Sequence, residues 1–447
     1  MKYENIKSAT LTFLVLLSLV LTWQIWTFQP DYALLKDTDY VNNPHLNEER
    51  NVSEVIVPEQ VIFHVEDGHS LLSSTDPLHT ELYEQWLTSR IEDISMISNL
   101  TMNQVAEKSI ELVFPTAIPG DIFLSLFPNL DEEFLMPLDN VDRVYIYSNP
   151  DTLKVHYRIV SNTEHKFADI ETAFSPSDFE ENYVSKAQEY MKVFAFPVGT
   201  QQGQWRKKLY LPEEPITVEN MSYTITPVSV DVFKQLLFND PFSVKYFSQG
   251  NGEESYTDGN RLINIIDSGN FMDYINPIYS ENPERGSRNV IVSSIDFING
   301  HGGWTDQYVL YDWISNGMKE EVKFRLTVNG YPIISMGGYD VMSLHVFRTG
   351  NQTSRYVRPL FDLDSQPIDS AKTIVNLPSG YEVVEYLEKQ DFFDPALLER
   401  IAIGYEMKKW NAFVTMEPNW YIFYDELWQK VSLDDLNEGE VDDRGLE

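Results

Sequence analysis

The stretch SATLTFLVLLSLVLTWQIWTFQP, residues 8–30, decides how this chain is organised. It contains no ionisable side chain, and no other window of the sequence approaches that length without a charge. As an α-helix it would extend about 34 Å, which is enough to cross a hydrocarbon core of roughly 30 Å. We therefore expect a transmembrane helix over residues 8–30, preceded by a short segment, residues 1–7.

A cleaved signal peptide and a buried core helix are the alternatives for this stretch. A signal peptide ends at a small-residue cleavage site, whereas this run ends in the bulky residues Trp23, Trp26 and Phe28. A core helix is seldom apolar on every face. The absence of cysteine excludes a lipoprotein-type anchor. An uncleaved single-span anchor is therefore the prediction.

The flanking charges predict the orientation of the span. Lys2, Lys7 and the α-amino group precede it with only Glu4 against them, and acidic residues follow from Asp31 onward. Positive residues remain on the cytoplasmic side of a membrane. Residues 1–7 are therefore predicted to be cytoplasmic and the bulk of the chain extracellular, in a single-pass protein of the cell membrane.

The chain beyond the span is strongly acidic, with 31 basic and 68 acidic residues and a net charge of −37. Such a potential repels nucleic acid, so nucleic-acid binding is excluded. The chain is 43% hydrophobic and 13% aromatic, which suffices for packed cores. An exported chain without cysteine is typical of envelopes that do not use disulfides, and this indicates a Gram-positive-type cell surface.

Residues 31–447 are predicted to form a three-domain α+β ectodomain. The expected parts are an N-terminal domain over 31–199, a central domain over 200–303, and a C-terminal domain with an acidic tail over 304–447. Polar, glycine-containing segments at 199–208 and 300–303 mark the boundaries. Asp258-Gly259 and Asn329-Gly330 each predict a hairpin turn before an aliphatic pair. This echo indicates that the two distal, strand-rich domains are related to each other.

Local patterns predict individual elements of these domains. A helix that begins after Asp76 carries apolar residues at helical spacing, namely Leu78, Leu82, Trp86, Ile91 and Ile94. Residues 142–148 and 153–161 are predicted to form a hairpin, and residues 175–193 a capped helix. Two long strands, 401–408 and 413–424, precede the acidic tail.

No motif in the sequence predicts an active site. The zinc signatures, the two commonest serine hydrolase signatures and the EF-hand pattern are all absent. His64, His69 and His79, beside Glu66 and Asp67, come nearest to a metal cluster. His64 and His69 span a strand-to-turn change and need not converge, so we interpret them as surface or core polar residues. We predict no catalytic, cofactor-binding or metal-binding residue, and a protein that is not an enzyme.

The membrane span itself carries a patterned face. Six residues of this face follow one another at intervals of three or four positions, and Thr22 lies beside them. The members of the face are Leu11, Leu14, Ser18, Leu21, Thr22, Ile25 and Phe28. Ser18 and Thr22 form a small-xxx-small pair, which lets a second helix approach closely and offers hydroxyls for hydrogen bonds across the contact. A Leu-rich span can show this spacing by accident, but lipid-facing positions need no Ser18 or Thr22. We predict that this face binds a partner helix.

The opening MKYENIK, together with LVLLSLVLTWQIWTFQP at 14–30, resembles the YycH family of Gram-positive bacteria. The similarity continues through SYTDGNRL at 255–262, LPSGYEVVEYL at 377–387 and EPNWY at 417–421. The N-terminal stretch is its most specific part. The distal half also resembles the sister protein YycI, so the resemblance implies a YycI-like C-terminal domain.

The resemblance implies a bitopic regulator of WalK (YycG), the sensor histidine kinase of the WalK/WalR system that controls cell-wall metabolism. It implies a complex with YycI and the kinase in which transmembrane helices matter, lipid contact through one span, and no enzymatic activity. A homodimer is left open. Whether the protein inhibits or activates the kinase is also left open, because family members are described both as inhibitors and as activators. Two other classes remain as alternatives: a binding protein that captures a wall-derived ligand or peptide in an interdomain cleft, and a wall hydrolase.

Overall fold

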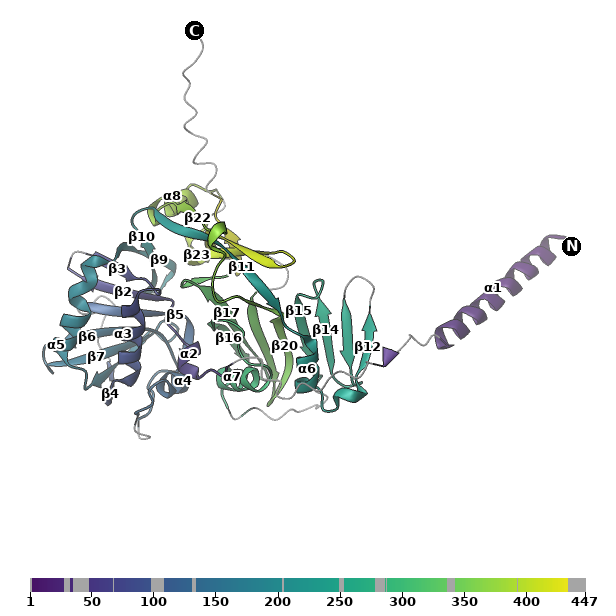
Figure 1. The fold of residues 1–447 in the computed structure, drawn as a ribbon, viewed down its shortest axis with the longest axis horizontal. Helices are drawn as coiled ribbons and strands as arrows, with labels where there is room; N and C mark the ends of the chain where they lie inside the picture. Colours follow the sequence, from purple (N-terminus) through teal and green to yellow (C-terminus); the bar gives the residue numbers. More distant parts are fainter. Residues whose placement is uncertain are drawn as a thin grey trace, which may run out of the picture.

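The computed structural model describes residues 2–27, 33–34, 48–66, 68–97, 108–130, 134–202, 205–248, 253–277, 286, 288–335, 342–391 and 393–432. Three sheets with short helices form the body of the molecule, and one long helix stands apart from it at the N-terminus (Figure 1). The predicted fold class, a strand-rich α+β protein with one apolar N-terminal helix, is confirmed.

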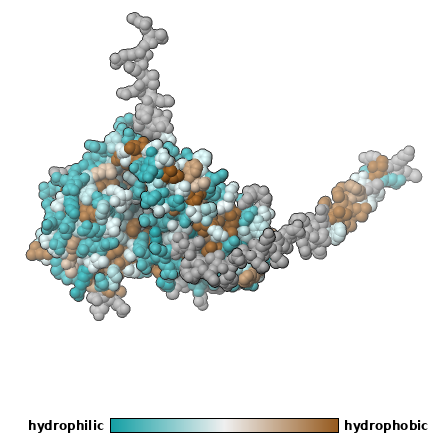
Figure 2. All heavy atoms as spheres, viewed as in Figure 1, coloured by the Kyte–Doolittle hydropathy of each residue, from teal (hydrophilic) through white to brown (hydrophobic). Residues whose placement is uncertain are grey.

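The N-terminal helix α1, Lys2–Thr27, is long and apolar enough to cross a membrane. Its segment Asn5–Trp23 has a mean hydropathy of 1.8, and none of it is buried against the rest of the protein. In Figure 2 the side chains of α1 are largely hydrophobic, whereas the visible face of the body is mostly hydrophilic. This arrangement fits a single-pass membrane anchor with a large ectodomain.

The first sheet is antiparallel, has nine strands and contains only residues from the N-terminal half of the chain. Its strands, in spatial order, are β10 (Trp205–Pro212), β9 (Met191–Gln202), β3 (Gly68–Leu72), β2 (Gln60–Val65), β5 (Ser109–Pro119), β6 (Asn140–Asn149), β7 (Lys154–Ser161), β8 (Lys166–Thr172) and β4 (Ile91–Ile97). The predicted hairpin over 142–161 is present as β6 and β7.

The two faces of the first sheet differ sharply. One face is apolar and packs beneath helix α3, Pro77–Thr88, whose Trp86 lies among the rings of Phe114, Phe123 and Phe127. Successive residues of a strand point to opposite sides, so one sheet can carry two different faces. The other face of this sheet carries polar strand residues, among them Glu111 and Arg143.

The shorter helices of the described residues are α2 (Val52–Val55), α4 (Gly120–Ser125), α5 (Pro176–Asn182), α6 (Val230–Leu237), α7 (Val290–Gly300) and α8 (Gly380–Glu388).

The second sheet has ten strands and combines residues from both distal parts of the sequence. Its order is β1 (Ala33–Leu34), β12 (Lys245–Ser248), β13 (Glu254–Thr257), β14 (Leu262–Ile266), β15 (Phe271–Ile275), β20 (Gln352–Pro359), β19 (Ser343–Thr349), β17 (Lys319–Val328) and β16 (Tyr308–Asn316), with β18 (Tyr331–Pro332) paired to β17. Turns at Asp258-Gly259 and Asn329-Gly330 join successive strands, as predicted. The strands of the central and C-terminal stretches thus meet in one sheet, at the β15–β20 pair.

The third sheet has six strands and closes the fold. It contains β21 (Phe361–Leu363), β11 (Ile216–Pro227), β24 (Phe413–Tyr424) and β23 (Leu398–Lys409), with β22 (Thr373–Leu377) on β11 and β25 (Leu427–Lys430) on β24. The two long strands predicted near the C-terminus are β23 and β24. The third sheet touches the second where the backbone N–H of Ile334 donates to the carbonyl of Tyr405 at 2.9 Å.

Three local expectations are wrong, each because a distant strand overrides a local pattern. Helix α3 ends at Thr88, and Ile91 and Ile94 belong to edge strand β4, which pairs with β8. The helix expected over 175–193 is α-helical only over Pro176–Asn182 and continues as a 3-10 helix over Val184–Glu189, before β9 begins at Met191 and pairs with β3. The connector expected at 199–208 is largely strand, the ends of β9 and β10. The three-domain division remains a prediction.

The start of α8 docks against the first sheet, and Gly380 makes this possible. A Cβ at Gly380 would lie 2.5 Å from the Leu211 Cβ and 2.9 Å from the Pro212 carbonyl oxygen, both on β10. The neighbouring Tyr381 stacks on Phe194 of β9 with ring centroids 3.8 Å apart. The close approach therefore ties the third sheet to the first.

We predict that Gly380→Ala lowers the free energy of unfolding by about 1–3 kcal/mol, because a methyl group in this contact forces backbone apart. Urea unfolding followed by tryptophan fluorescence measures the loss. Gly300→Ala is the matched control, since no atom lies within 4 Å of a Cβ at Gly300. An equal loss of stability in both variants would contradict the close-packing explanation.

Candidate functional sites: the apolar helix and the interdomain cleft

The patterned face of α1 is exposed where the structure describes it. Leu11, Leu14 and Leu21 are 64%, 54% and 50% exposed. The Thr22 hydroxyl donates to the backbone carbonyl of Ser18 at 2.8 Å, so its proton is used inside the helix and only its oxygen can accept a bond from outside. The Ser18 hydroxyl has no hydrogen-bond partner among the described residues. Phe28 and the side chain of Ile25 lie outside the described residues, and the role of this face remains a prediction.

His64 and His69 do come together, which the sequence analysis did not expect. They are directly opposite each other on β2 and β3, with their Nδ1 atoms 2.8 Å apart. The overlooked signal was Asp67-Gly68, a pair that favours a tight hairpin turn. His79 lies elsewhere, on α3, and Glu66 is exposed. No group of three or more His, Asp or Glu that could hold a metal ion exists among the described residues.

Glu111 of β5 sits at the centre of the polar group around these histidines. It is fully buried, with Oε2 2.9 Å from His64 Nε2 and 2.6 Å from the Tyr210 hydroxyl, while Arg143 donates to Oε1. Burial alone would raise the pKa of Glu111, but Arg143, His64 and Tyr210 outweigh burial and lower it to about 2. Each group has a partner, so the cluster is a neutralised structural network.

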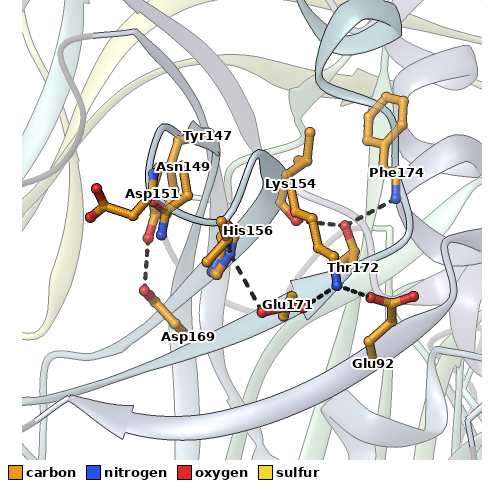
Figure 3. A network of polar contacts seen from close by, with 12 residues as sticks. Glu92, Tyr147, Asn149, Asp151, Lys154, His156, Asp169, Glu171, Thr172 and Phe174 are labelled. Atoms are coloured by element: carbon orange, nitrogen blue, oxygen red, sulfur yellow. Dashed lines mark hydrogen bonds and ion pairs between the residues drawn. The ribbon is translucent and has the colours of Figure 1, made fainter.

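A second polar network lies at the far end of the same sheet, and its charged groups also have partners. Figure 3 shows Lys154 of β7 between Glu92 and Glu171, with the Glu92 carboxylate at 2.5 Å. Nearby, Asp169 accepts from the Tyr147 hydroxyl at 2.7 Å and pairs with Arg158. Cross-strand pairs of this kind stabilise a sheet face. We therefore interpret this network as structural.

A cleft opens where the three sheets meet. It has a volume of about 630 Å³ and is lined from the first sheet by β5, β6 and β10, from the second by β16 and β17, and from the third by β23 and β25. A smaller cavity of about 130 Å³ shares Arg143, Lys207 and Arg400 with it. Across the junction, Trp313 Nε1 donates to the carbonyl of Ala117 at 2.7 Å.

The lining of the cleft is rich in charge. Its basic residues are Arg143, Lys207, Lys323, Arg325 and Arg400, and its acidic residues are Asp142, Asp312, Glu399 and Glu426. Burial raises the pKa of both Asp142 and Asp312. A local excess of one positive charge contrasts with the net charge of −36 of the whole chain. Aromatic side chains, among them Tyr311 and Trp428, complete the walls.

Arg400 joins the three sheets at this cleft. Its Nη2 lies 2.6 Å from one carboxylate oxygen of Glu59, next to β2 in the first sheet. Its guanidinium carbon is 5.0 Å from the ring centroid of Tyr311 in the second sheet and 5.7 Å from that of Trp428 in the third. The Arg400 charge is thus neutralised by a carboxylate and covered by two rings.

Lys207 differs from the other basic groups that face the cleft. It has no hydrogen-bond or ion-pair partner among the described residues. Its side chain is reached by solvent within the cleft, yet the protein atoms around it, together with Arg400 and Arg143, lower the pKa of its ammonium to about 8. Lys207 is therefore a cation held beside two other cations without a carboxylate of its own.

Two family models match the chain. The model described as the YycH protein, N-terminal domain, matches residues 4–189, and that described as the YycH protein, C-terminal domain, matches residues 206–438. Among curated proteins, the two-component system WalR/WalK regulatory protein YycH of Bacillus subtilis (strain 168) is 26% identical over 444 residues, which cover 94% of each chain.

A solved structure shares the fold. The crystal structure of YycH from Bacillus subtilis superposes with a TM-score of 0.69 at 19% identity, covering 87% of this chain and 99% of that chain. At this identity the likeness shows the fold alone.

The His69 ring predicts how stability depends on pH. Burial, His64 and Lys208 lower the pKa of His69 from 6.5 to about 4, so the folded protein keeps this ring neutral. The contribution of His69 to the free energy of unfolding is therefore complete above pH 6.5. It is lost as the pH falls from 6.5 through 4, because the unfolded chain then binds a proton that the folded protein does not.

We expect His69→Asn, which keeps a polar atom near the His64 ring, to reduce the loss of unfolding free energy between pH 7 and pH 4.5 by about 2 kcal/mol. Urea titrations at several pH values measure it. His165→Asn is the control, since His165 is an exposed residue of the β7–β8 turn. An unchanged pH slope in His69→Asn would exclude this histidine as the source.

Proposed function

The chain belongs to the YycH family, and from this premise we propose that it is a membrane-anchored accessory regulator of the WalK (YycG) sensor histidine kinase, which controls cell-wall metabolism. The YycH of Bacillus subtilis is a regulatory protein of the WalR/WalK two-component system. The observation that carries the proposal is α1, a long apolar helix that packs against none of the body. Its exposed face offers a contact surface inside the membrane.

We propose that α1 enters the membrane with its N-terminus in the cytoplasm. Lys2 and Lys7 precede the span, and the chain beyond it is acidic. The described residues that follow α1 then lie outside the cell, so regulation passes through the membrane or the ectodomain.

The proposed mechanism is helix packing against the kinase, together with YycI. Regulation requires that the Leu11–Phe28 face binds one signalling state of the kinase more tightly than the other, because only a difference in affinity shifts the equilibrium. A few kcal/mol of difference is sufficient. Ser18 is the donor in this contact, since the Thr22 proton is already bound to the Ser18 carbonyl.

A second function, capture of a ligand by the ectodomain, is favoured by the interdomain cleft. Polar groups from three sheets converge on one cavity of about 630 Å³. Cavities of this size at domain junctions are usual ligand sites. Ligand capture and kinase regulation are compatible, because a ligand that joins the sheets would give the ectodomain a sensory role.

We predict that Ser18→Leu weakens association with the kinase about three- to tenfold, because the bulkier side chain prevents close approach and removes the donor. Co-purification from membranes, with quantification of both proteins, measures the effect. Val20→Leu is the matched control, since position 20 lies on the opposite side of the helix. Equal association of both variants and the wild type would refute packing through this face.

Disulfide crosslinking maps the same contact independently. The chain has no cysteine, so single cysteines at Leu14, Ser18, Leu21 and Ile25 report on one face, and cysteines at Leu16 and Val20 report on the other. We expect crosslinks to partner-helix cysteines from the first set only. Crosslinks of equal yield from both sets would indicate that α1 has no preferred face, and crosslinks between copies of this chain would indicate a homodimer.

A further inference from the structure

The cleft contains a positive charge that the protein itself does not neutralise. Three cations of the first sheet and the junction have carboxylate partners: Lys154 lies between Glu92 and Glu171, Arg143 binds Glu111, and Arg400 binds Glu59. Lys207 has no such contact within the described residues, although four carboxylates line the same cleft.

The surroundings of Lys207 increase the cost of leaving its charge unpaired. After burial itself, the charges that act most strongly on its ammonium are the cations of Arg400 and Arg143, followed by Glu59 and Asp142. Glu59 and the carboxylate behind Arg143 are already committed to those arginines. Lys207, Arg143 and Arg400 line the same cleft, so an anionic group placed beside Lys207 would be attracted by all three cations.

The rest of the lining restricts what else the ligand carries. Four carboxylates, on Asp142, Asp312, Glu399 and Glu426, face the same cavity, so a polyanion would be repelled. A ligand with one negative charge and a positively charged or N–H-rich part can pair with both the cations and the carboxylates of the lining. The walls at Tyr311, Phe423 and Trp428 are aromatic, and they accommodate apolar or small side chains beside the charged groups.

We infer that the cleft between the three sheets binds a short zwitterionic peptide whose free carboxylate pairs with Lys207 and whose amino group faces the acidic residues of the lining. The inference deepens the second proposed function, ligand capture by the ectodomain, and does not depend on helix packing. The cavity of about 630 Å³ has room for a few residues of peptide. Because β10, β17 and β23 come from different sheets, the bound peptide would also hold the sheets together.

The test is calorimetric titration of the full-length protein in detergent micelles with trialanine, trialanine amide and inorganic phosphate. We expect saturable binding of trialanine. Replacing its carboxylate by an amide should weaken binding about tenfold or more, because a charge-assisted hydrogen bond contributes about 1.5–3 kcal/mol. Phosphate should bind more weakly than trialanine, because the acidic lining repels a multiply charged anion.

Variants separate binding from folding. Lys207→Gln should lose affinity for trialanine about tenfold and no longer distinguish the acid from the amide, while Lys207→Arg, which keeps the charge, should retain both. Lys108→Gln is the control, since Lys108 is an exposed lysine at the start of β5 outside the cleft. The thermal midpoint of each variant shows that it is folded.

Several results would overturn the inference. They are the absence of saturable trialanine binding up to about 10 mM, equal affinity of the wild type and Lys207→Gln, or tighter binding of phosphate than of trialanine. None of these titrations contains the kinase. Their failure would therefore not contradict the proposal of helix packing against the kinase. Failure of the Ser18 experiment would likewise not contradict ligand binding in the cleft.

Discussion

The contact on which the body depends is the one made by Arg400. This side chain leaves β23 in the third sheet, binds Glu59 beside the first sheet, and lies against Tyr311 of the second and Trp428 of the third. Removing one partner of this partly buried pair would leave a charge without its counter-ion at the junction and destabilise it. The pairing therefore specifies how the three sheets are placed, and the cleft exists because they meet at charged side chains instead of an apolar seam.

The distribution of charge gives this junction its character. A chain with a net charge of −36 repels most anions at long range, yet five cations line the cleft between the sheets against four carboxylates. Arg143 and Arg400 are matched by buried or half-buried carboxylates and act structurally. Lys207 is unmatched, and that difference separates a structural arginine from a residue available to a ligand. The helix α1 and the cleft thus differ in chemistry: α1 is apolar and exposed, whereas the cleft is lined by charged side chains of both signs.

Much of the fold could be predicted where the signal is local. The hairpins at Asp258-Gly259 and Asn329-Gly330 follow from the positive φ that glycine permits, and Gly259 and Gly330 have φ of 96° and 80°. Local sequence patterns do not predict strands whose pairing partners are distant in the chain. Strand β9 begins at Met191 because β3, more than 100 residues earlier, pairs with it, and no helical periodicity can reveal this. The His64–His69 pair was a local signal that went unused.

The sequence by itself determined that α1 is long and apolar enough to cross a membrane, because the cost of placing a segment in hydrocarbon is a sum over its own side chains and needs no neighbours. It also determined the acidic, cysteine-free character of the body and the α+β class. Only the tertiary structure decided the cleft. Glu59 and Arg400 are 341 positions apart, and Lys207 shares a cleft with Arg143 and Arg400 only because the first and third sheets pack together. The electrostatic environment of a side chain depends on what surrounds it in space, and for these residues the surroundings come from three different sheets.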